Sequence, residues 1–345
     1  MMRYELMGKS GLRVSELCLG TMTFGEDWGW GSSKDESRKV YDAFLEAGGN
    51  FIDTANVYTN GTSERLLGEF MTGHRERIVL ATKYTNAPPG NDPNAAGNHR
   101  KSMMQAVEAS LKRLKTNYID LYLLHIWDQM TPIEEVMRGF EDLVRQGKIL
   151  YAGISDMPAW LVARANTLAE LRGWPAFINL QIEYSLIERT PERELVPMAT
   201  ELGLGVTAWS PLAGGLLTGK QFEQGGAKGS RQSDASMQQF MKSNARKEAV
   251  VREVVAVARE SGHSPAQVAL AWLRQRPEPV IPIIGARKLA QVKDNLASVD
   301  VRLAPAAVER LNAVSRIEMG FPHDFYAMDM PRSLSSGGMW NQIDA

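Results

Sequence analysis

The chain has 345 residues, of which 44% are hydrophobic and 23% are charged. This composition supplies a sizeable core and excludes disorder on a large scale. The length suits a large barrel, a large α/β sheet or a protein built from two domains. There are 39 basic and 40 acidic residues, which gives a formal net charge of −1. This balance gives no indication of nucleic-acid binding or of electrostatic attachment to a membrane.

The single cysteine and the N-terminal residues indicate the cellular compartment. Cys18 lies between two leucines and has no second cysteine for an internal disulfide, which fits a reducing compartment. The first residues contain no apolar segment typical of a signal peptide. No apolar run approaches the roughly 18 residues that a membrane-spanning helix needs. We therefore expect a cytoplasmic protein without a membrane partner.

Short apolar runs alternate with longer helical patterns along nearly the whole chain, and eight runs are predicted to be strands. Between the first two, Asp35–Ala47 places Val40, Phe44 and Ala47 on one helical face. Ser33 and Glu36 have the spacing of a capping box, and the Thr-Pro pair at Pro132 is typical of a helix start. The predicted strands are Glu16–Gly20, Asn50–Asp53, Ile78–Lys83, Ile119–His125, Leu150–Ser155, Phe177–Gln181, Gly205–Ser210 and Val280–Ile284.

Strand-helix alternation implies a parallel sheet with helical crossovers. Eight units favour a closed (β/α)₈ barrel (TIM barrel), which we expect to form a single domain over residues 1–345. A doubly wound Rossmann sheet is the alternative. It usually carries G-x-G-x-x-G after its first strand, and the turn at Leu19–Gly25 lacks that pattern.

Two stretches depart from the alternation. The interval after the seventh strand begins with a polar segment, Gly219 to about Asn244, which we expect to be a functional loop or disordered. The tail after about Gly320 scatters Phe321 and Trp340 among turn formers.

Three consecutive predicted strands end in residues capable of acid-base chemistry. Asp53, Lys83 and His125 terminate the second, third and fourth strands, and Tyr58 follows Asp53 by five residues. The carboxyl ends of barrel strands form the active site in this fold. Singly, each residue has an ordinary alternative, as a helix cap, a solvated lysine or a core histidine. Together they predict a catalytic group at the barrel mouth.

At this point the chain closely resembles the aldo-keto reductase superfamily. The resemblance runs over about residues 10–315, in the family's order. It rests on Asp53 to Tyr58, Ala81-Thr82-Lys83, Leu123-Leu124-His125, Gly153-Ile154-Ser155, Gln181, the run from Trp209 to Lys220, and Gly285-Ala286-Arg287. It implies an oxidoreductase that reduces aldehydes or ketones to alcohols with NADPH.

The resemblance assigns Tyr58 as the general acid. A tyrosine has an ordinary pKa near ~10 and needs a nearby cation to act at neutral pH. Lys83 can supply that charge, Asp53 can hold Lys83 protonated, and His125 can donate to the carbonyl oxygen. Positioned proton transfer of this kind accelerates a reaction by about 10²–10⁴-fold.

The cofactor residues are also carried over from the resemblance. Ser155, Asp156 and Gln181 are expected at the nicotinamide carboxamide, although many members have Asn where this chain has Asp156. A carboxylate can accept from the amide but cannot donate to its carbonyl. Arg287, just before a helix, suits the 2′-phosphate that distinguishes NADPH from NADH. The remaining expected contacts are Gly20, Thr21, Met22, Asp53, Trp209, Ser210, Pro211, Leu212, Gly214, Leu217, Gly219, Lys220, Gly285, Gln291 and Asn295.

The substrate is expected to be a small-molecule carbonyl compound held by Trp28, Trp30 and Trp127. An aromatic pocket suits carbonyls with apolar or planar groups. Two other functions remain open. One is a regulatory or scaffold protein that binds the cofactor without turnover. The other is a lyase or hydrolase, which would need a metal cluster or paired acids; no His-x-His or His-Glu-x-x-His pattern occurs.

Overall fold

Eight parallel strands close into a barrel in the order β10-β3-β4-β5-β6-β7-β8-β9. The computed structural model describes residues 1–88, 90–220 and 244–343. All eight predicted strands are present, with ends within two residues of the expected ones, and the TIM barrel is confirmed over the Rossmann alternative. The barrel strands are β3 (Cys18–Gly20), β4 (Phe51–Asp53), β5 (Val79–Tyr84), β6 (Ile119–Leu124), β7 (Ile149–Ser155), β8 (Phe177–Glu183), β9 (Gly205–Trp209) and β10 (Val280–Gly285).

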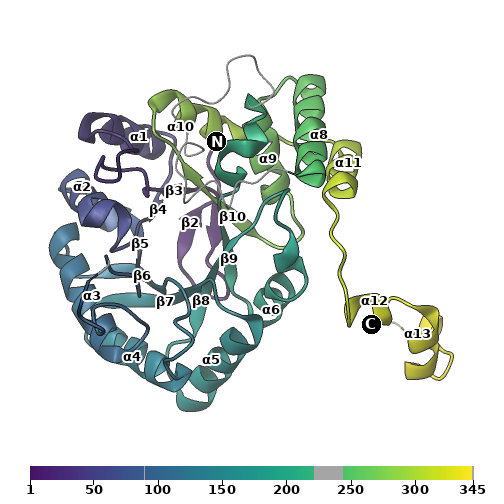
Figure 1. The fold of residues 1–345 in the computed structure, drawn as a ribbon, viewed down its shortest axis with the longest axis horizontal. Helices are drawn as coiled ribbons and strands as arrows, with labels where there is room; N and C mark the ends of the chain where they lie inside the picture. Colours follow the sequence, from purple (N-terminus) through teal and green to yellow (C-terminus); the bar gives the residue numbers. More distant parts are fainter. Residues whose placement is uncertain (89, 221–243, 344–345) are drawn as a thin grey trace.

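Helices surround the barrel as an outer ring (Figure 1). The barrel's helices are α1 (Lys34–Glu46), α2 (Thr62–Phe70), α3 (Arg100–Leu114), α4 (Ile133–Arg145), α5 (Ala159–Arg172), α6 (Leu195–Leu202), α8 (Ala245–Ser261), α9 (Pro265–Arg274), α10 (Leu289–Leu296) and α11 (Pro305–Ser315). Short 3₁₀ segments are η1 (Tyr58–Gly61), η2 (Arg75–Arg77), η3 (Thr190–Glu192), η4 (Ala213–Thr218) and η7 (Ala297–Asp300). No helix of the described chain has the length and apolarity to cross a bilayer.

An N-terminal hairpin closes the barrel at the end opposite the strand carboxyl ends. β1 (Tyr4–Leu6) pairs antiparallel with β2 (Arg13–Ser15), and neither strand was predicted from the sequence. Met7 and Val14 join the apolar cluster inside the barrel. The turn fits tightly: Gly8 has φ +57°, and a Cβ there would come within 2.4 Å of the carbonyl oxygen of Gly203. Only glycine is suited to that position.

Two helix starts differ in detail from the sequence patterns. The Ser33 side chain accepts from the Glu36 amide, as a cap should. The Glu36 carboxylate instead accepts from the Leu289 amide at 2.8 Å, so it links α1 to α10 rather than completing a capping box. Pro132 is the N-cap of α4 and not its first helical residue, so the expectation for its threonine was wrong.

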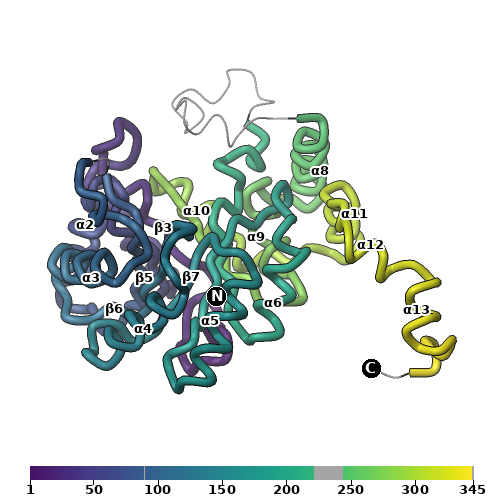
Figure 2. Tube along the Cα trace, turned by 60° about the horizontal axis from the view of Figure 1, so that its bottom comes forward, coloured from purple at the N-terminus to yellow at the C-terminus, as the bar shows by residue number. Residues whose placement is uncertain are grey.

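The chain ends in an extension that leaves the barrel. It contains α12 (His323–Tyr326), α13 (Asp329–Ser335) and η8 (Trp340–Gln342). Figures 1 and 2 both show it reaching away from the helical ring beside α11. We call residues 317–343 the C-terminal arm. The expected polar loop after the seventh strand lies largely outside the described residues.

Candidate active site

The strand pattern places Asp53 and Lys83 at the last inward positions of β4 and β5, and His125 directly after β6 at the position that continues its inward face. Successive side chains of a strand point to opposite sides, so residues two apart share a face. Phe51 precedes Asp53 by two residues, Ala81 precedes Lys83, and Leu123 precedes His125. Phe51, Ala81 and Leu123 all belong to the apolar cluster inside the barrel. The three polar side chains therefore continue that interior at its carboxyl end.

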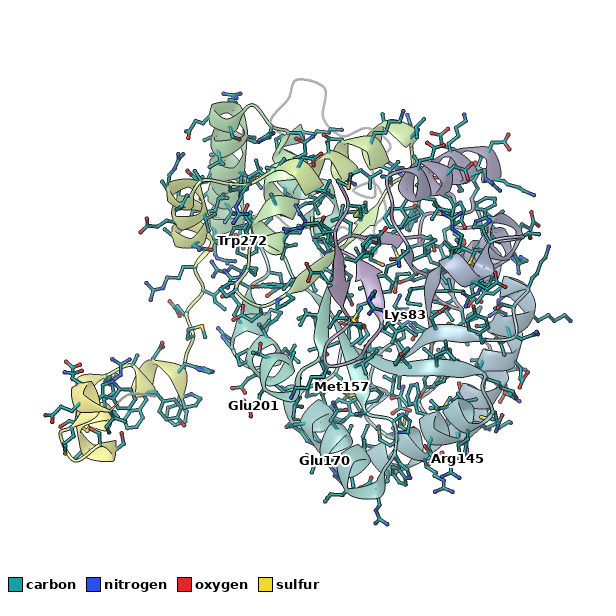
Figure 3. All side chains as sticks on the ribbon, turned by 180° about the vertical axis from the view of Figure 1, so that it is seen from behind. Lys83, Arg145, Met157, Glu170, Glu201 and Trp272 are labelled. Atoms are coloured by element: carbon teal, nitrogen blue, oxygen red, sulfur yellow. The ribbon has the colours of Figure 1, made fainter. Side chains whose placement is uncertain are left out.

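Lys83 is the centre of the arrangement and is fully buried. Figure 3 shows it among the strands, inside the helical ring. Its Nζ donates to Asp53 Oδ1 at 2.5 Å and to the Thr54 carbonyl oxygen at 2.9 Å. The third contact is with the Tyr58 hydroxyl oxygen, at 3.3 Å. An ammonium has three donors, and these three acceptors satisfy them.

The charges keep Lys83 protonated. Burial alone would lower the pKa of Lys83, but the charge of Asp53, assisted by Tyr58 and the hydrogen bonds, outweighs it, and the pKa is raised. The other Asp53 oxygen, Oδ2, accepts from Gln181 Nε2 at 2.9 Å. Both carboxylate oxygens of Asp53 are thus hydrogen-bonded. Gln181, which was predicted as a cofactor contact, is also a hydrogen-bond partner of Asp53.

A strained turn holds Tyr58 at the mouth. Thr59 and Asn60, in η1, have φ of +45° and +54°. The left-handed region is uncommon for residues other than glycine. The Thr59 hydroxyl donates to the Phe24 carbonyl oxygen at 2.7 Å, and this bond fixes the turn to the loop that carries Trp28. The Tyr58 ring meets Trp28 edge-on, with centroids 6.4 Å apart.

His125 lies across from Tyr58, with ring centroids 5.8 Å apart. Asn86 Nδ2 is 3.2 Å from His125 Nδ1. An amide nitrogen can only donate, so Nδ1 accepts and the proton of a neutral ring resides on Nε2. Burial, with the charge of Lys83, lowers the pKa of His125 to about 3. His125 is therefore neutral at physiological pH and offers one N–H donor.

Two pairs of tryptophans lie on segments adjoining these residues. Trp28 and Trp30 are 5.4 Å apart between ring centroids. Trp127, which follows β6, meets Trp160 of α5 edge-on at 6.1 Å. Trp28, Trp30 and Trp127 were predicted as pocket residues from the sequence. Trp160 was not, because its contact with Trp127 depends on how the start of α5 packs against the loop after β6.

The expected nicotinamide contacts lie at neighbouring strand ends. Ser155 and Gln181 are paired in register, and Trp209 follows on the next strand. Ser155 Oγ is buried near Asp156 but makes no hydrogen bond of normal geometry. Asp156 has φ +45°, and its Oδ1 accepts from Trp209 Nε1 at 3.0 Å. Desolvation by the surrounding groups raises the pKa of Asp156 to about 6, although part of the residue is exposed, and the Trp209 hydrogen bond opposes this shift.

The expected phosphate segment is an irregular turn. Ser210 and Ala213 have positive φ, as do Gly214, Gly215 and Gly219. Gly215 has open space where a Cβ would stand, so its backbone is accessible. Pro211 and Leu217 are buried. The Leu217 side chain belongs to the core between strands and helices, so only its backbone could contact a cofactor. Leu212 is half-buried, and Lys220 is exposed at the edge of the described segment.

The residues expected around the adenosine have structural partners. Gln291 Oε1 accepts from the Arg287 and Lys288 amides, at 2.9 and 3.2 Å, at the start of α10. Asn295 is buried and donates to the Gly285 carbonyl oxygen at 3.4 Å. The Arg287 side chain is half-buried before α10.

The first barrel turn is also engaged in the fold. Gly20 lies between Gly285 of β10 and Asp53 of β4, and Met22 is half-buried. The Thr21 hydroxyl donates to the Asp53 carbonyl oxygen at 2.9 Å. These positions border the mouth, but the Thr21 side chain fixes the loop that follows β3.

Two residues that contact the catalytic candidates were not predicted from the sequence. Asn86 and Thr54 bond to His125 and Lys83, respectively. Asn86 follows β5 by two residues, so the rule that points to strand ends could have found it. Thr54 acts through its backbone and gives no side-chain signal. In the described part of the chain, no three His, Cys, Asp or Glu side chains gather as a metal site requires.

Comparison with known proteins agrees with this geometry. Residues 16–316 match the aldo/keto reductase family. The chain is 39% identical to an aryl-alcohol dehydrogenase [NADP(+)] of Phanerodontia chrysosporium, over 92% of this chain and 87% of that protein. It is 38% identical to norsolorinic acid reductase B of Dothistroma septosporum, over 93% of this chain and 83% of that protein. It is also 37% identical to an uncharacterized oxidoreductase of Bacillus subtilis, over 91% of this chain and 96% of that protein.

Proposed function

Since the chain belongs to the aldo/keto reductase family, and is thus an oxidoreductase of carbonyl compounds, we propose that it reduces aromatic aldehydes or ketones with NADPH, with Tyr58 as general acid. The observation that carries this proposal is the contact of the buried Lys83 ammonium with the Tyr58 hydroxyl, opposite a neutral His125.

The hydrogen-bond directions support Tyr58 as the proton donor. Lys83 donates to the phenol oxygen, so the phenol proton is left for another acceptor. When that proton moves to a substrate oxygen, negative charge develops on the phenol beside a fixed cation. An adjacent opposite charge favours the ionised form. The pairing of Lys83 with Asp53 keeps that cation in place.

His125 supplies a second contact to the same substrate oxygen. Its Nδ1 is bonded to Asn86, and its neutral form leaves Nε2–H as a donor. A neutral donor can polarise a carbonyl without adding a second positive charge near Lys83. We assign His125 to orienting the carbonyl and Tyr58 to protonating it.

The strand ends fit a nicotinamide cofactor. The carboxamide has both a donor and an acceptor, and Ser155, Asp156 and Gln181 together offer both kinds of group. The accessible backbone of Gly215 and the cation of Arg287 suit phosphate oxygens. Bound NADPH would supply the hydride to the carbonyl carbon. Arg287 is the basis for preferring NADPH over NADH.

The aromatic surroundings support the substrate class. Trp28 contacts Tyr58 directly, and Trp127 lies two residues beyond His125. Flat apolar groups gain stacking and burial on such rings. The relative named an aryl-alcohol dehydrogenase points the same way.

The test is loss of NADPH absorbance with a panel of aromatic and aliphatic aldehydes matched in size, and the reverse reaction with aryl alcohols and NADP⁺. We expect turnover, with kcat/KM higher for the aromatic members and for NADPH than for NADH. Binding of NADPH without turnover of any carbonyl compound would favour the scaffold alternative and overturn the proposal.

A further inference from the structure

The C-terminal arm is an exposed part of the chain with an organised shape. None of residues 317–343 is buried. Figures 1 and 2 show the arm standing clear of the helical ring. Within it, the Gly320 amide donates to Asp324 at 3.0 Å, and Arg332 stacks on the Trp340 ring at 5.6 Å. Local contacts therefore give the arm a defined form.

The root of the arm is fixed to the rim of the barrel. Arg193 donates to the Glu318 carbonyl oxygen at 2.6 Å, and His323 lies 3.3 Å from Glu194. Arg193 and Glu194 belong to the segment after β8, on the side where the strands' carboxyl ends open. The arm thus begins beside the mouth and projects outward from it.

The arm concentrates many large, exposed apolar side chains in one short segment. Nine large apolar side chains are 41–86% exposed: Phe321, Phe325, Tyr326, Met328, Met330, Leu334, Met339, Trp340 and Ile343. Taking about 200 Å² for each side chain, they expose on the order of 1,000 Å². The largest apolar patch on a typical monomer is about 300–600 Å². A stable interface buries about 800 Å² of each partner, which this arm supplies.

The charge of the arm argues for a protein surface. The arm contains three acids, Glu318, Asp324 and Asp329, and one base, Arg332, which gives a formal net charge of −2 without any lysine. Anionic membranes and nucleic acids attract clusters of lysine and arginine, which the arm does not have.

A second copy of the chain offers a matching surface. Ile126, Met130 and Trp160 are exposed apolar side chains on the loop after β6 and at the start of α5. Trp127 connects them through its edge-on contact with Trp160. We call these four residues the rim patch. Because every chain carries both an arm and a rim patch, two copies can exchange arms reciprocally, as in an isologous dimer.

We propose that the C-terminal arm docks on the rim patch of a second copy, and that the protein is a dimer with exchanged arms. Trp127 is two residues from His125, so the docked arm would lie beside the candidate active site. The dimer itself does not rest on the proposed function, since its test uses neither cofactor nor substrate.

The first test is the mass of the full chain by sedimentation at micromolar concentration. We expect a dimer for the wild type. Two variants should dissociate at least about 100-fold more readily: an arm variant (Phe321→Ser, Tyr326→Ser, Leu334→Ser) and a patch variant (Met130→Ser, Trp160→Ser). Leu171→Ser is the matched control, because Leu171 is exposed at the opposite end of α5. An unchanged far-UV circular dichroism spectrum and a cooperative thermal transition would confirm that each variant folds.

Crosslinking tests where on the second copy the arm docks. The native cysteine, Cys18, is buried, so an introduced cysteine would be the reactive one. In air with copper–phenanthroline as the oxidation catalyst, mixed Leu334→Cys and Met130→Cys chains should form an intermolecular disulfide, whereas Leu334→Cys with Leu171→Cys should not. A monomeric wild type, a dimer that survives the arm or patch substitutions, or Leu334→Cys chains that crosslink chiefly with each other would each overturn the proposal.

Discussion

Replacement of Tyr58 by phenylalanine separates the chemistry of the site from its stability. The ring and its contacts with Trp28 and His125 remain, and only the hydroxyl is removed. Lys83 loses one acceptor at 3.3 Å but keeps Asp53 and the Thr54 carbonyl oxygen. Loss of a single hydrogen bond costs about 1 kcal/mol of unfolding free energy. Loss of a positioned proton donor costs about 10²–10⁴-fold in rate, which is about 2.7–5.4 kcal/mol of activation free energy.

The assay is kcat/KM for an aromatic aldehyde, with NADPH affinity and the thermal unfolding midpoint measured on the same samples. We expect a fall in kcat/KM of at least about 100-fold, with NADPH binding and folding nearly unchanged. Tyr4→Phe is the matched control, because Tyr4 donates to the Gly48 carbonyl oxygen outside the site, and its activity should equal that of the wild type. If Tyr58→Phe retained kcat/KM within about threefold, the general-acid assignment would be refuted.

Three further predictions concern charged residues. Lys83→Met leaves the buried Asp53 charge without its cation, which should cost about 3–5 kcal/mol of unfolding free energy and abolish turnover. Adding Asp53→Asn removes the uncompensated charge and should recover stability but not activity. Recovery of both would contradict the catalytic role of the Lys83 ammonium. Arg287→Ala should weaken NADPH binding by about 1.5–3 kcal/mol and leave NADH binding unchanged, and equal losses would exclude a 2′-phosphate contact. Asp156 has a pKa raised to about 6, so its neutral form, which can donate to the carboxamide, disappears as pH rises through that value. NADPH affinity should fall between about pH 5 and 7.5 in the wild type and stay flat in Asp156→Asn, and the same slope in both would show that another group titrates.

The barrel could be predicted because its signals are local and repeated. Each buried parallel strand is a short apolar run, and the register of a closed barrel brings the strand ends together without further information. Asp53, Lys83 and His125 were selected by that rule, and the structure brings them together with Tyr58.

The parts that were missed depend on distant contacts. The hairpin strands β1 and β2 have three residues each, too few for a periodic pattern, and their pairing is fixed by packing of Met7 and Val14 in the barrel end. The bond from Gln181 to Asp53 joins residues 128 positions apart. Glu36 has capping-box spacing, but Leu289 on another helix competes for its carboxylate. Local propensity gives no information about such competition.

The most direct measurement is a crystal structure of the protein with NADP⁺ and an unreactive aromatic carboxylate in the aldehyde's place. A ligand oxygen should accept hydrogen bonds from both Tyr58 Oη and His125 Nε2, at about 2.6–3.2 Å, while Lys83 stays bonded to the phenol. A ligand oxygen bonded to neither group, or a phenol turned away from Lys83, would contradict the mechanism.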